Sequence, residues 1–261
     1  MAGKAVAEKK KTEVAAFDPG MFEDDAGAGM ENMGVEDLAL PFLKILSGLD
    51  PILDEMEEAR KGDIFNTVNN TVYKGKEGLN VIPCAYMRRF IQWAPRGSGS
   101  GAPQAIYAPG APGLPKTERS SEDNKEYVVG GNGEYIEETH QHFVMIVGED
   151  GSVETALIAM KSTQLKKSRK WNSMISSLTM QGKNGPFTPP RFSHVYHLKS
   201  VSEENSKGSW HGWDISRVGP VEEASVYARA KTFSESVLSG DVVVKHENES
   251  SVSSQSDDVP F

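Results

Sequence analysis

LNVIPCAYMRRFIQW, residues Leu79–Trp93, is the stretch that decides the fold. It contains β-branched and aromatic residues and follows the turn-forming segment 75–78, a combination typical of a strand. Alternate side chains of a strand point to opposite faces, so Tyr86, Arg88 and Phe90 share one face. The sequence therefore predicts a long strand with one aromatic and basic face.

The segments before this strand are shorter. Residues 63–67 and 71–73 have strand-like composition and are separated by a turn signal of two asparagines. Further upstream, Leu38, Phe42 and Ile45 fall at helical spacing. A proline fits the first turn of a helix. The pattern therefore predicts a short helix that begins near Pro41.

The segment after the strand predicts a loop and then a hairpin. Residues 96–138 contain many Gly, Pro and polar residues, which indicates a long insertion without regular structure. Residues 140–148 and 152–160 are apolar, β-branched runs joined through Asp150-Gly151. Asp-Gly between two such runs is a strong hairpin signal.

The remaining segments complete a recognisable order of elements. Residues 162–180 predict a helix capped by Ser162 or Thr163, and two strands (192–201, 209–218) and a final helix (221–238) follow. The expected fold is therefore mainly β with flanking helices. The order matches the five-stranded OB barrel, in which a helix typically lies between strands 3 and 4. An immunoglobulin-like sandwich is the rival, but it has no natural place for that helix.

Charge and composition divide the chain into three parts. Residues 1–34 predict a disordered N-terminal arm, 35–238 the OB domain, and 239–261 a disordered acidic tail. The net charge of -9 taken alone argues against contact with phosphates. However, residues 79–218 carry 16 Lys and Arg against 13 Asp and Glu. The negative charge is therefore concentrated at the two ends.

Several function classes find little support in the sequence. It has no apolar run long enough to span a membrane and no export signal, so a cytoplasmic protein without membrane contact is expected. The single cysteine, Cys84, excludes an intramolecular disulfide and a multi-Cys zinc site and is expected in the core. No nucleophile or phosphate-loop motif occurs. We therefore expect no catalytic residue, no metal and no cofactor.

Two histidine pairs leave a metal enzyme open as an alternative. His140 and His142 are spaced to share one face of a strand, and His194 and His197 lie close together in a later one. No cysteine or carboxylate completes either pair with the usual spacing of a metal site. A metal-dependent nuclease that uses His140 and His142 is thus the less favoured alternative.

Cations and aromatic residues alternate in three segments, which is the composition that sequence-tolerant binding of single strands requires. Each segment has a structural alternative, because strand aromatics often pack in a core and helix cations often form a solvated face. The candidate DNA-contact residues are Tyr86, Arg88, Arg89, Phe90, Trp93, Arg96, Lys161, Lys166, Lys167, Arg169, Lys170, Trp171, Arg191, Tyr196, Lys199, Trp210 and Trp213.

The chain ends with a motif suited to protein docking. A terminal aromatic residue with its free carboxylate fits an apolar pocket with a basic rim, and adjacent carboxylates fit the cations around that pocket. The candidate protein-binding residues are Asp257, Asp258, Val259, Pro260 and Phe261. A merely solubilising acidic tail is the alternative.

This end resembles the acidic tip of bacterial single-stranded DNA-binding proteins. It departs from the commonest form in Ser256, where a third Asp often stands, and in Val259, where Ile is usual. The segments 40–46, 62–67 and 81–96 resemble a group of tailed-bacteriophage strand-binding proteins, a similarity that covers most of residues 36–218. The resemblance implies an OB fold, a viral origin and docking on replication, recombination or repair proteins.

The expected function is non-catalytic coating of single-stranded DNA during phage DNA replication, recombination or repair, by a dimer or higher oligomer. A strand-annealing recombination mediator is the main alternative, because it uses the same contacts to bring two strands together. A viral structural protein is a further alternative, and for such a protein no salt-dependent binding to oligonucleotides is expected.

Overall fold

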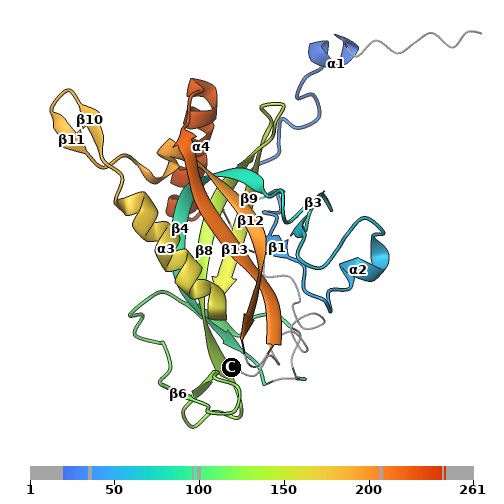
Figure 1. Cartoon of the computed structure of the whole chain (residues 1–261), viewed down its shortest axis with the longest axis vertical. Coiled ribbons are helices and arrows are strands. Elements are labelled where there is room, and N and C mark those ends of the chain that lie inside the picture. Colours follow the sequence, from blue (N-terminus) through green and yellow to red (C-terminus); the bar gives the residue numbers. More distant parts are fainter. Residues whose placement is uncertain are drawn as a thin grey trace, which may run out of the picture. The chain divides into compact units, whose positions relative to one another are not determined.

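The predicted long strand forms as a single element, β4 (Leu79–Trp93), and the main sheet is built around it (Figure 1). The structure is a computed structural model that describes residues 20–34, 37–95, 97–98, 101–205, 208–242 and 244. The chain divides into two units, Met1–Leu38 and Ala39–Phe261. In the first unit, the described part of the predicted arm contains the short helix α1 (Gly20–Asp24). Residues 1–19 of that arm and 245–261 of the predicted tail lie outside the described residues.

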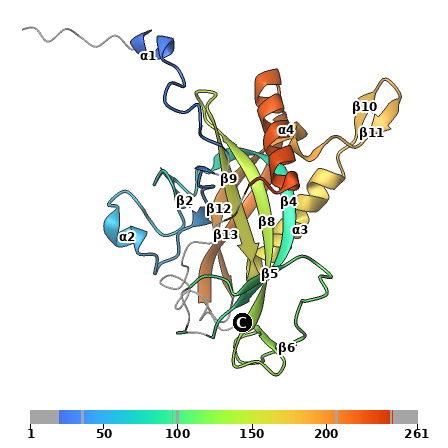
Figure 2. The same ribbon diagram turned by 180° about the vertical axis from the view of Figure 1, so that it is seen from behind.

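Five long strands form the body of the main sheet. They are β4, β8 (Tyr135–Val147), β9 (Val153–Lys161), β12 (His194–Asn205) and β13 (Gly208–Pro220). They lie in the order β9-β8-β4-β12-β13, each antiparallel to its neighbours. The sheet curls into a half-barrel, which confirms the mainly β class (Figure 2). Among the described strands, none of the pairings joins β9 to β13, so a closed five-stranded barrel is not confirmed.

The insertion contains more regular structure than its composition predicted. Its described part forms β5 (Ala105–Tyr107), β6 (Thr117–Arg119) and β7 (Glu126–Val128). β5 pairs with the end of β4, and β6 and β7 extend the sheet beyond β8, so the main sheet has eight strands in the described part of the chain. Three-residue strands are too short to show an alternating pattern, which explains why composition alone predicted a loop.

A second small sheet precedes the main one, and it corrects the prediction at Pro41. It consists of β1 (Leu43–Ile45), β2 (Ile64–Asn66) and β3 (Val72–Tyr73), with a four-residue helix, α2 (Ile52–Glu55), between β1 and β2. The helix predicted to begin near Pro41 is wrong. The carbonyl of Pro41 accepts a hydrogen bond from the Leu157 amide at 2.8 Å, and β1 pairs with β2. Pairing with two other segments therefore overrides the helical spacing.

Helix α3 (Leu165–Ser176) contacts both β9 and β13, the two ends of the five-strand order, and follows a short 3-10 helix, η2 (Ser162–Gln164). Its Trp171 and Ile175 share a core with Met160 of β9 and Trp213 of β13. The predicted cap at Ser162 or Thr163 is wrong, because α3 is preceded by Gln164 and has no side-chain cap. Ser162 instead adopts a φ of 50°, a conformation rare outside glycine, at the turn from β9 into η2.

Helix α4 (Ala224–Ser239) covers the opposite face of the sheet and confirms the predicted final helix. Val226, Ala230 and Phe233 recur at helical spacing and pack in a second core with Phe143 of β8. The helix ends at Gly240, whose φ of 90° allows a left-handed cap. The sheet therefore carries a core on each face, one under α3 and one under α4.

The chain between α3 and β12 forms a hairpin and a short turn. β10 (Met180–Gly182) pairs with β11 (Gly185–Phe187), and the hairpin projects away from the sheet in both views (Figures 1 and 2). The 3-10 helix η3 (Arg191–Ser193) then leads into β12. In the described part of the chain, no helix is long and apolar enough to cross a membrane.

Candidate functional site

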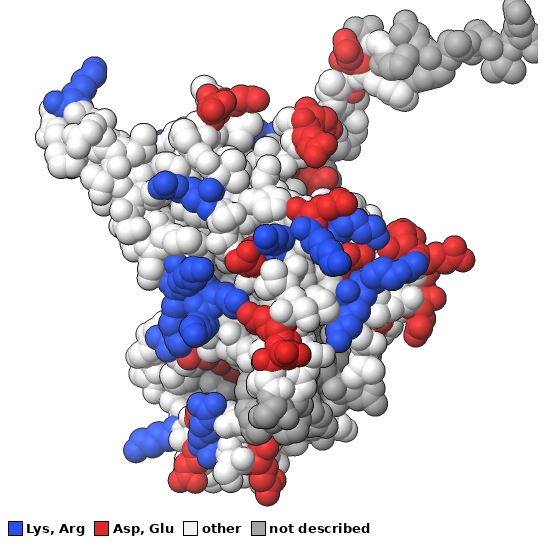
Figure 3. All heavy atoms as spheres, in the orientation of Figure 1, with Lys and Arg blue, Asp and Glu red and all other residues white. Residues whose placement is uncertain are grey.

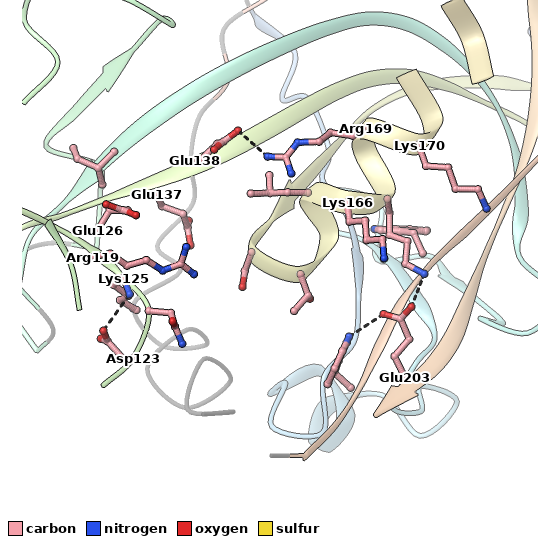
Figure 4. Close-up of a pocket in the computed structure, with 18 of the residues that line it drawn as sticks. Arg119, Asp123, Lys125, Glu126, Glu137, Glu138, Lys166, Arg169, Lys170 and Glu203 are labelled. Atoms are coloured by element: carbon pink, nitrogen blue, oxygen red, sulfur yellow. Dashed lines mark hydrogen bonds and ion pairs between the residues drawn. The ribbon is translucent and has the colours of Figure 1, made fainter. Parts of the chain in front are cut away.

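A cleft of about 1190 Å³ opens beside the start of α3 (Figure 4). Its walls come from η2 and α3, the β6–β7 hairpin, the start of β8, the end of β12, and β13. The β6–β7 hairpin belongs to the insertion between β4 and β8. A connection and two strands that are far apart in the sequence are thus brought to one cleft.

Helix α3 supplies the basic wall of the cleft. Lys166, Lys167, Arg169 and Lys170 all line it, and Lys and Arg side chains gather over this part of the surface (Figure 3). Lys167 is ion-paired with Glu203, and Arg169 lies 3.7 Å from a carboxylate. Lys166 and Lys170 are exposed and have no ion pair within the described part of the chain. These two cations are therefore available to an anionic ligand.

The other walls carry both charges, so the cleft is not uniformly positive. Glu137 and Glu138 line it from β8, and Glu203, Glu204 and Asp214 from β12 and β13. Several of these carboxylates pair with cations, as Asp214 does with Lys199 at 3.5 Å and Glu137 with Lys161 at 3.5 Å. Positive charge is therefore concentrated along α3.

Two aromatic rings in the cleft are only half-buried. The ring of Tyr135 lies 4.2 Å from the Lys125 ammonium, and the Trp210 indole donates a hydrogen bond to Glu203 at 3.0 Å. Each ring therefore combines an accessible surface with a nearby charge that orients it.

A chain of buried polar groups holds α3 against the sheet beneath this wall. The Nη2 atom of Arg191 lies 2.8 Å from His142 Nδ1, and His142 Nε2 lies 2.8 Å from Ser168 Oγ. Ser168 Oγ also lies 2.7 Å from His140 Nδ1, and His140 Nε2 lies 2.9 Å from a Glu138 oxygen. We call Arg191, His142, Ser168, His140 and Glu138 the polar chain.

The direction of each hydrogen bond follows from the first donor. A guanidinium can only donate, so His142 Nδ1 accepts and the proton of this neutral imidazole is on Nε2. His142 then donates to Ser168, Ser168 donates to His140 Nδ1, and His140 Nε2 donates to Glu138. All four hydrogen bonds along the polar chain are therefore made with both histidines neutral and Glu138 ionised, whereas the buried Nε atom of Arg191 has no hydrogen-bond partner among the described residues.

The pKa shifts agree with these protonation states. Burial and the nearby Arg191 charge lower the pKa of His142 well below its ordinary value, and burial also lowers the pKa of His140. Burial favours neutral Glu138, but the hydrogen bond from His140 and the charge of Arg88 outweigh it and lower its pKa. Arg88 itself lies 2.9 Å from Glu138. Near neutral pH, the polar chain therefore has a positive charge at Arg191 and a negative charge at Glu138, with neutral groups between them.

These contacts bear on the metal-site alternative. All four ring nitrogens of His140 and His142 are hydrogen-bonded to members of the polar chain, so none is free to bind a metal ion in this arrangement. His194 and His197 are three residues apart on one strand and so point to opposite faces. Among the described residues, no three or more His, Cys, Asp or Glu side chains are grouped to hold a metal.

The order Ser168, His140, Glu138 has the connectivity of a nucleophilic triad, in which a base activates a serine and a carboxylate orients the base. Ser168 is fully buried, however, and its hydroxyl group contacts both histidines. A substrate therefore cannot reach this oxygen unless α3 separates from the sheet.

The structure brings six of the predicted DNA-contact residues together at the cleft: Lys166, Lys167, Arg169, Lys170, Trp210 and, almost fully buried in its wall, Trp213. Lys161 and Lys199 are also close to it, but both pair with carboxylates of its walls. Arg96 and the predicted tip, residues 257–261, lie outside the described residues.

Four predicted stacking residues instead belong to the protein interior. Trp171 and Tyr196 have no exposed surface, and Trp213 and Trp93 are only 3% and 8% exposed. One face of Trp171 is covered by His142, whose ring stacks on it at a centroid distance of 4.6 Å. A base cannot stack on these rings without opening the core. Arg191 is similarly internal, because it donates to Asn172 at 2.9 Å and to His142.

The residues predicted on β4 divide between its two faces. Tyr86 packs against His140 and His142, and Arg88 lies over the Phe90 ring at 5.0 Å, so these three share a face as predicted. Arg89 is on the other face, where it contacts the Met87 sulfur. Phe90 and Arg88 remain partly accessible beside the polar chain.

Sequence reasoning missed Ser168, Glu138 and Glu203. A signal for Ser168 was present, because it precedes Trp171 by three residues and Ile175 by seven and therefore lies on the buried face of the helix. Glu138 precedes His140 by two residues and so shares its strand face. The role of Glu203 depends on its contact with Lys167 of α3 across the cleft, and no local pattern indicates that contact.

One family model matches this chain, the Pam3 phage gp34-like protein model, over residues 9–243. The match includes all strands of the main sheet, the cleft and the polar chain. No curated protein and no solved structure matches the chain. Because the model covers most of the sequence, the chain belongs to the Pam3 phage gp34-like protein family.

Proposed function

We propose that this phage protein binds single-stranded DNA along the basic wall of its cleft, without sequence specificity and without catalysis. One observation carries the proposal. Residues 155–202 contain eight Lys and Arg and not one Asp or Glu, in a chain whose net charge is -9. This segment includes η2, α3 and the β10–β11 hairpin. Such a concentration of positive charge is the electrostatic signature of phosphate contact.

The order of the long strands supports an OB-related fold as the finer description of the half-barrel. The order β9-β8-β4-β12-β13, with α3 between β9 and β12, is the OB order numbered 3-2-1-4-5. OB folds bind oligonucleotides on strands 2 and 3 and on the loops after strands 1 and 4. The connection that corresponds to the first of these loops is the insertion, and it lines the cleft together with Glu203, Glu204 and Trp210 of strands β12 and β13.

The accessible rings of the cleft give the bases a place to stack. Stacking of a base on an aromatic side chain contributes about 1 to 3 kcal/mol and tolerates any sequence. Trp210 and Tyr135 take this role in place of the buried tryptophans. The phosphates then follow Lys166 and Lys170, since these cations have no ion pair with another described residue.

The acidic end of the chain completes the proposal. Asp257 and Asp258 with the terminal Phe261 form a docking tip for phage or host proteins of DNA replication, recombination or repair. A flexible acidic segment on the same chain also has a high effective concentration at the basic wall and competes with DNA there. Self-association into a dimer or higher oligomer belongs to the same proposal.

Strand annealing remains a distinct activity that uses the same contacts. Mixing two complementary strands with the protein separates the two roles, because a coating protein slows their pairing and an annealing protein accelerates it.

The experiment that tests the binding site compares two charge-matched double variants. Lys166→Ala with Lys170→Ala removes the unpaired cations of the cleft, whereas Lys76→Ala with Lys231→Ala removes two exposed cations elsewhere. We expect the cleft variant to bind oligo-dT more weakly. The slope of its log binding constant against log salt concentration should also be smaller by about 0.7 for each phosphate that the protein no longer neutralises. Equal weakening in both variants would place the DNA outside the cleft.

A further inference from the structure

The β10–β11 hairpin has an apolar face that is not part of any described hydrophobic core. Met180 and Phe187 are directly opposite each other in the register and so lie on the same face, with 38% and 45% of their surfaces exposed. The Phe187 ring lies over Gly182, where an added Cβ would come within 3.1 Å of ring atom Cδ1. The glycine therefore lets the ring lie flat on the hairpin with its other side open.

The position of the hairpin connects it to the basic wall. It follows α3 directly in the chain and projects from the body, with basic atoms at its end (Figures 1 and 3). The residue in its turn is Lys183, and the hairpin lies within the segment that lacks Asp and Glu. Cations thus stand at both ends of this stretch, at Lys166 and Lys170 in the first half of α3 and at Lys183 in the hairpin tip, with no Lys or Arg in residues 171–182 between them.

We propose that this hairpin is a second contact element for the DNA strand held in the cleft, with the Met180–Phe187 face stacking on a base and Lys183 contacting a phosphate. The inference rests on the proposed function and adds a separate subsite to it. An exposed ring beside a cation, in the same segment without Asp or Glu as the cations of α3, is the composition of single-strand binding surfaces. A second copy of the chain could use the apolar face but has no need of the cations, so the same strand is the favoured occupant.

The geometry predicts a dependence on DNA length. The cations of the cleft lie in the first half of α3, and the hairpin follows the end of this 12-residue helix, which is about 18 Å long at about 1.5 Å per residue. A bound strand therefore reaches both subsites only if it is long enough to follow the helix. Short oligonucleotides therefore occupy the cleft alone, and longer ones reach both subsites.

The test measures binding of oligo-dT from about 4 to about 16 nucleotides, the range of OB-fold site sizes, by fluorescence anisotropy. We expect Phe187→Ala to weaken binding of the long oligonucleotides by about fivefold or more and to leave the shortest unchanged. For the long oligonucleotides only, Lys183→Ala should reduce the slope of log binding constant against log salt concentration by about 0.7. Leu238→Ala, which truncates an exposed apolar side chain on α4, is the matched control and should change neither.

Two outcomes would overturn the inference and leave the proposed function intact. In one, Phe187→Ala and Lys183→Ala bind every length like the wild type while the Lys166, Lys170 double variant binds more weakly. In the other, Phe187→Ala changes the oligomeric state in sedimentation but not DNA binding, which would identify the hairpin as a contact between copies. If the wild type binds no length at all, the proposed function itself fails.

Discussion

The Nε2 atom of His142 on β8 lies 2.8 Å from the Oγ atom of Ser168 on α3, at the centre of the buried polar chain. This contact joins the sheet to the helix that carries Lys166, Lys167, Arg169 and Lys170. The basic wall of the cleft is therefore positioned by the protein interior rather than by its own surface charges. If the cleft binds DNA as proposed, stability and DNA binding are linked through this helix.

Replacing Ser168 by Ala tests the structural role of the polar chain. The change leaves His142 without an acceptor and His140 without a donor, both in the interior. We expect the free energy of unfolding to fall by about 1 to 3 kcal/mol, the cost of unsatisfied buried polar groups. Urea denaturation measures it. Ser173→Ala, an exposed site on the same helix, should stay within about 0.5 kcal/mol of wild type, and equal stability of the two variants would contradict the account.

The lowered pKa values of His140 and His142 predict acid sensitivity. In the unfolded chain these groups titrate near about 6.5, so below that pH the unfolded state binds more protons than the folded state. The free energy of unfolding should therefore fall as the pH drops from about 6.5, by up to about 1.4 kcal/mol per pH unit for each histidine. Urea denaturation at several pH values checks this. A His142→Asn variant should show a shallower dependence, and a flat wild-type profile would be the contrary result.

Cys84 should be unreactive while the protein is folded. It is only 2% exposed, and burial raises the pKa of its thiol to about 12, so both access and the thiolate form are suppressed. A chromogenic aromatic disulfide should therefore label the thiol in urea but not in native buffer. Rapid stoichiometric labelling of the native protein would show that the core between β4 and α4 opens readily.

Deletion of residues 257–261 tests the docking tip. We expect the truncated protein to bind single-stranded DNA at least as tightly as the full chain, because a competing polyanion is removed, and to lose binding to partner proteins. Pull-down with phage or host replication proteins and anisotropy with oligo-dT measure the two effects. Partner binding that survives the deletion would refute the tip hypothesis.

The fold was predictable where local patterns are long. β4 has the predicted bounds, and the β8–β9 and β12–β13 pairs and α4 follow from alternation, an Asp-Gly turn and helical spacing. The failures are at short segments whose structure depends on distant partners. Phe42 bridges to Leu157, and the strands of the insertion form on the ends of β4 and β8, so neither feature has a local signal.

The sequence predicted which charged residues lie at the candidate site, but not which of the aromatic residues are buried. The cluster of cations on α3 and the shared face of His140 and His142 follow from spacing alone. The sequence does not distinguish Trp210, which is half-buried in the cleft, from Trp213, which lines the same cleft but is only 3% exposed. The two indoles differ in burial because one face of β13 packs against α3 and the core. The pairing of Lys167 with Glu203 likewise requires the tertiary structure.

The most direct test of the central claim is a salt titration of wild-type binding to labelled oligo-dT. We expect binding at low salt. Between about 50 and about 200 mM salt, the logarithm of the binding constant should fall linearly with the logarithm of the salt concentration, with a slope of about -0.7 for each phosphate contact. We also expect quenching of Trp210 fluorescence that disappears in a Trp210→Phe variant. No binding at low salt, or an affinity that does not change with salt, would contradict single-stranded DNA binding by this protein.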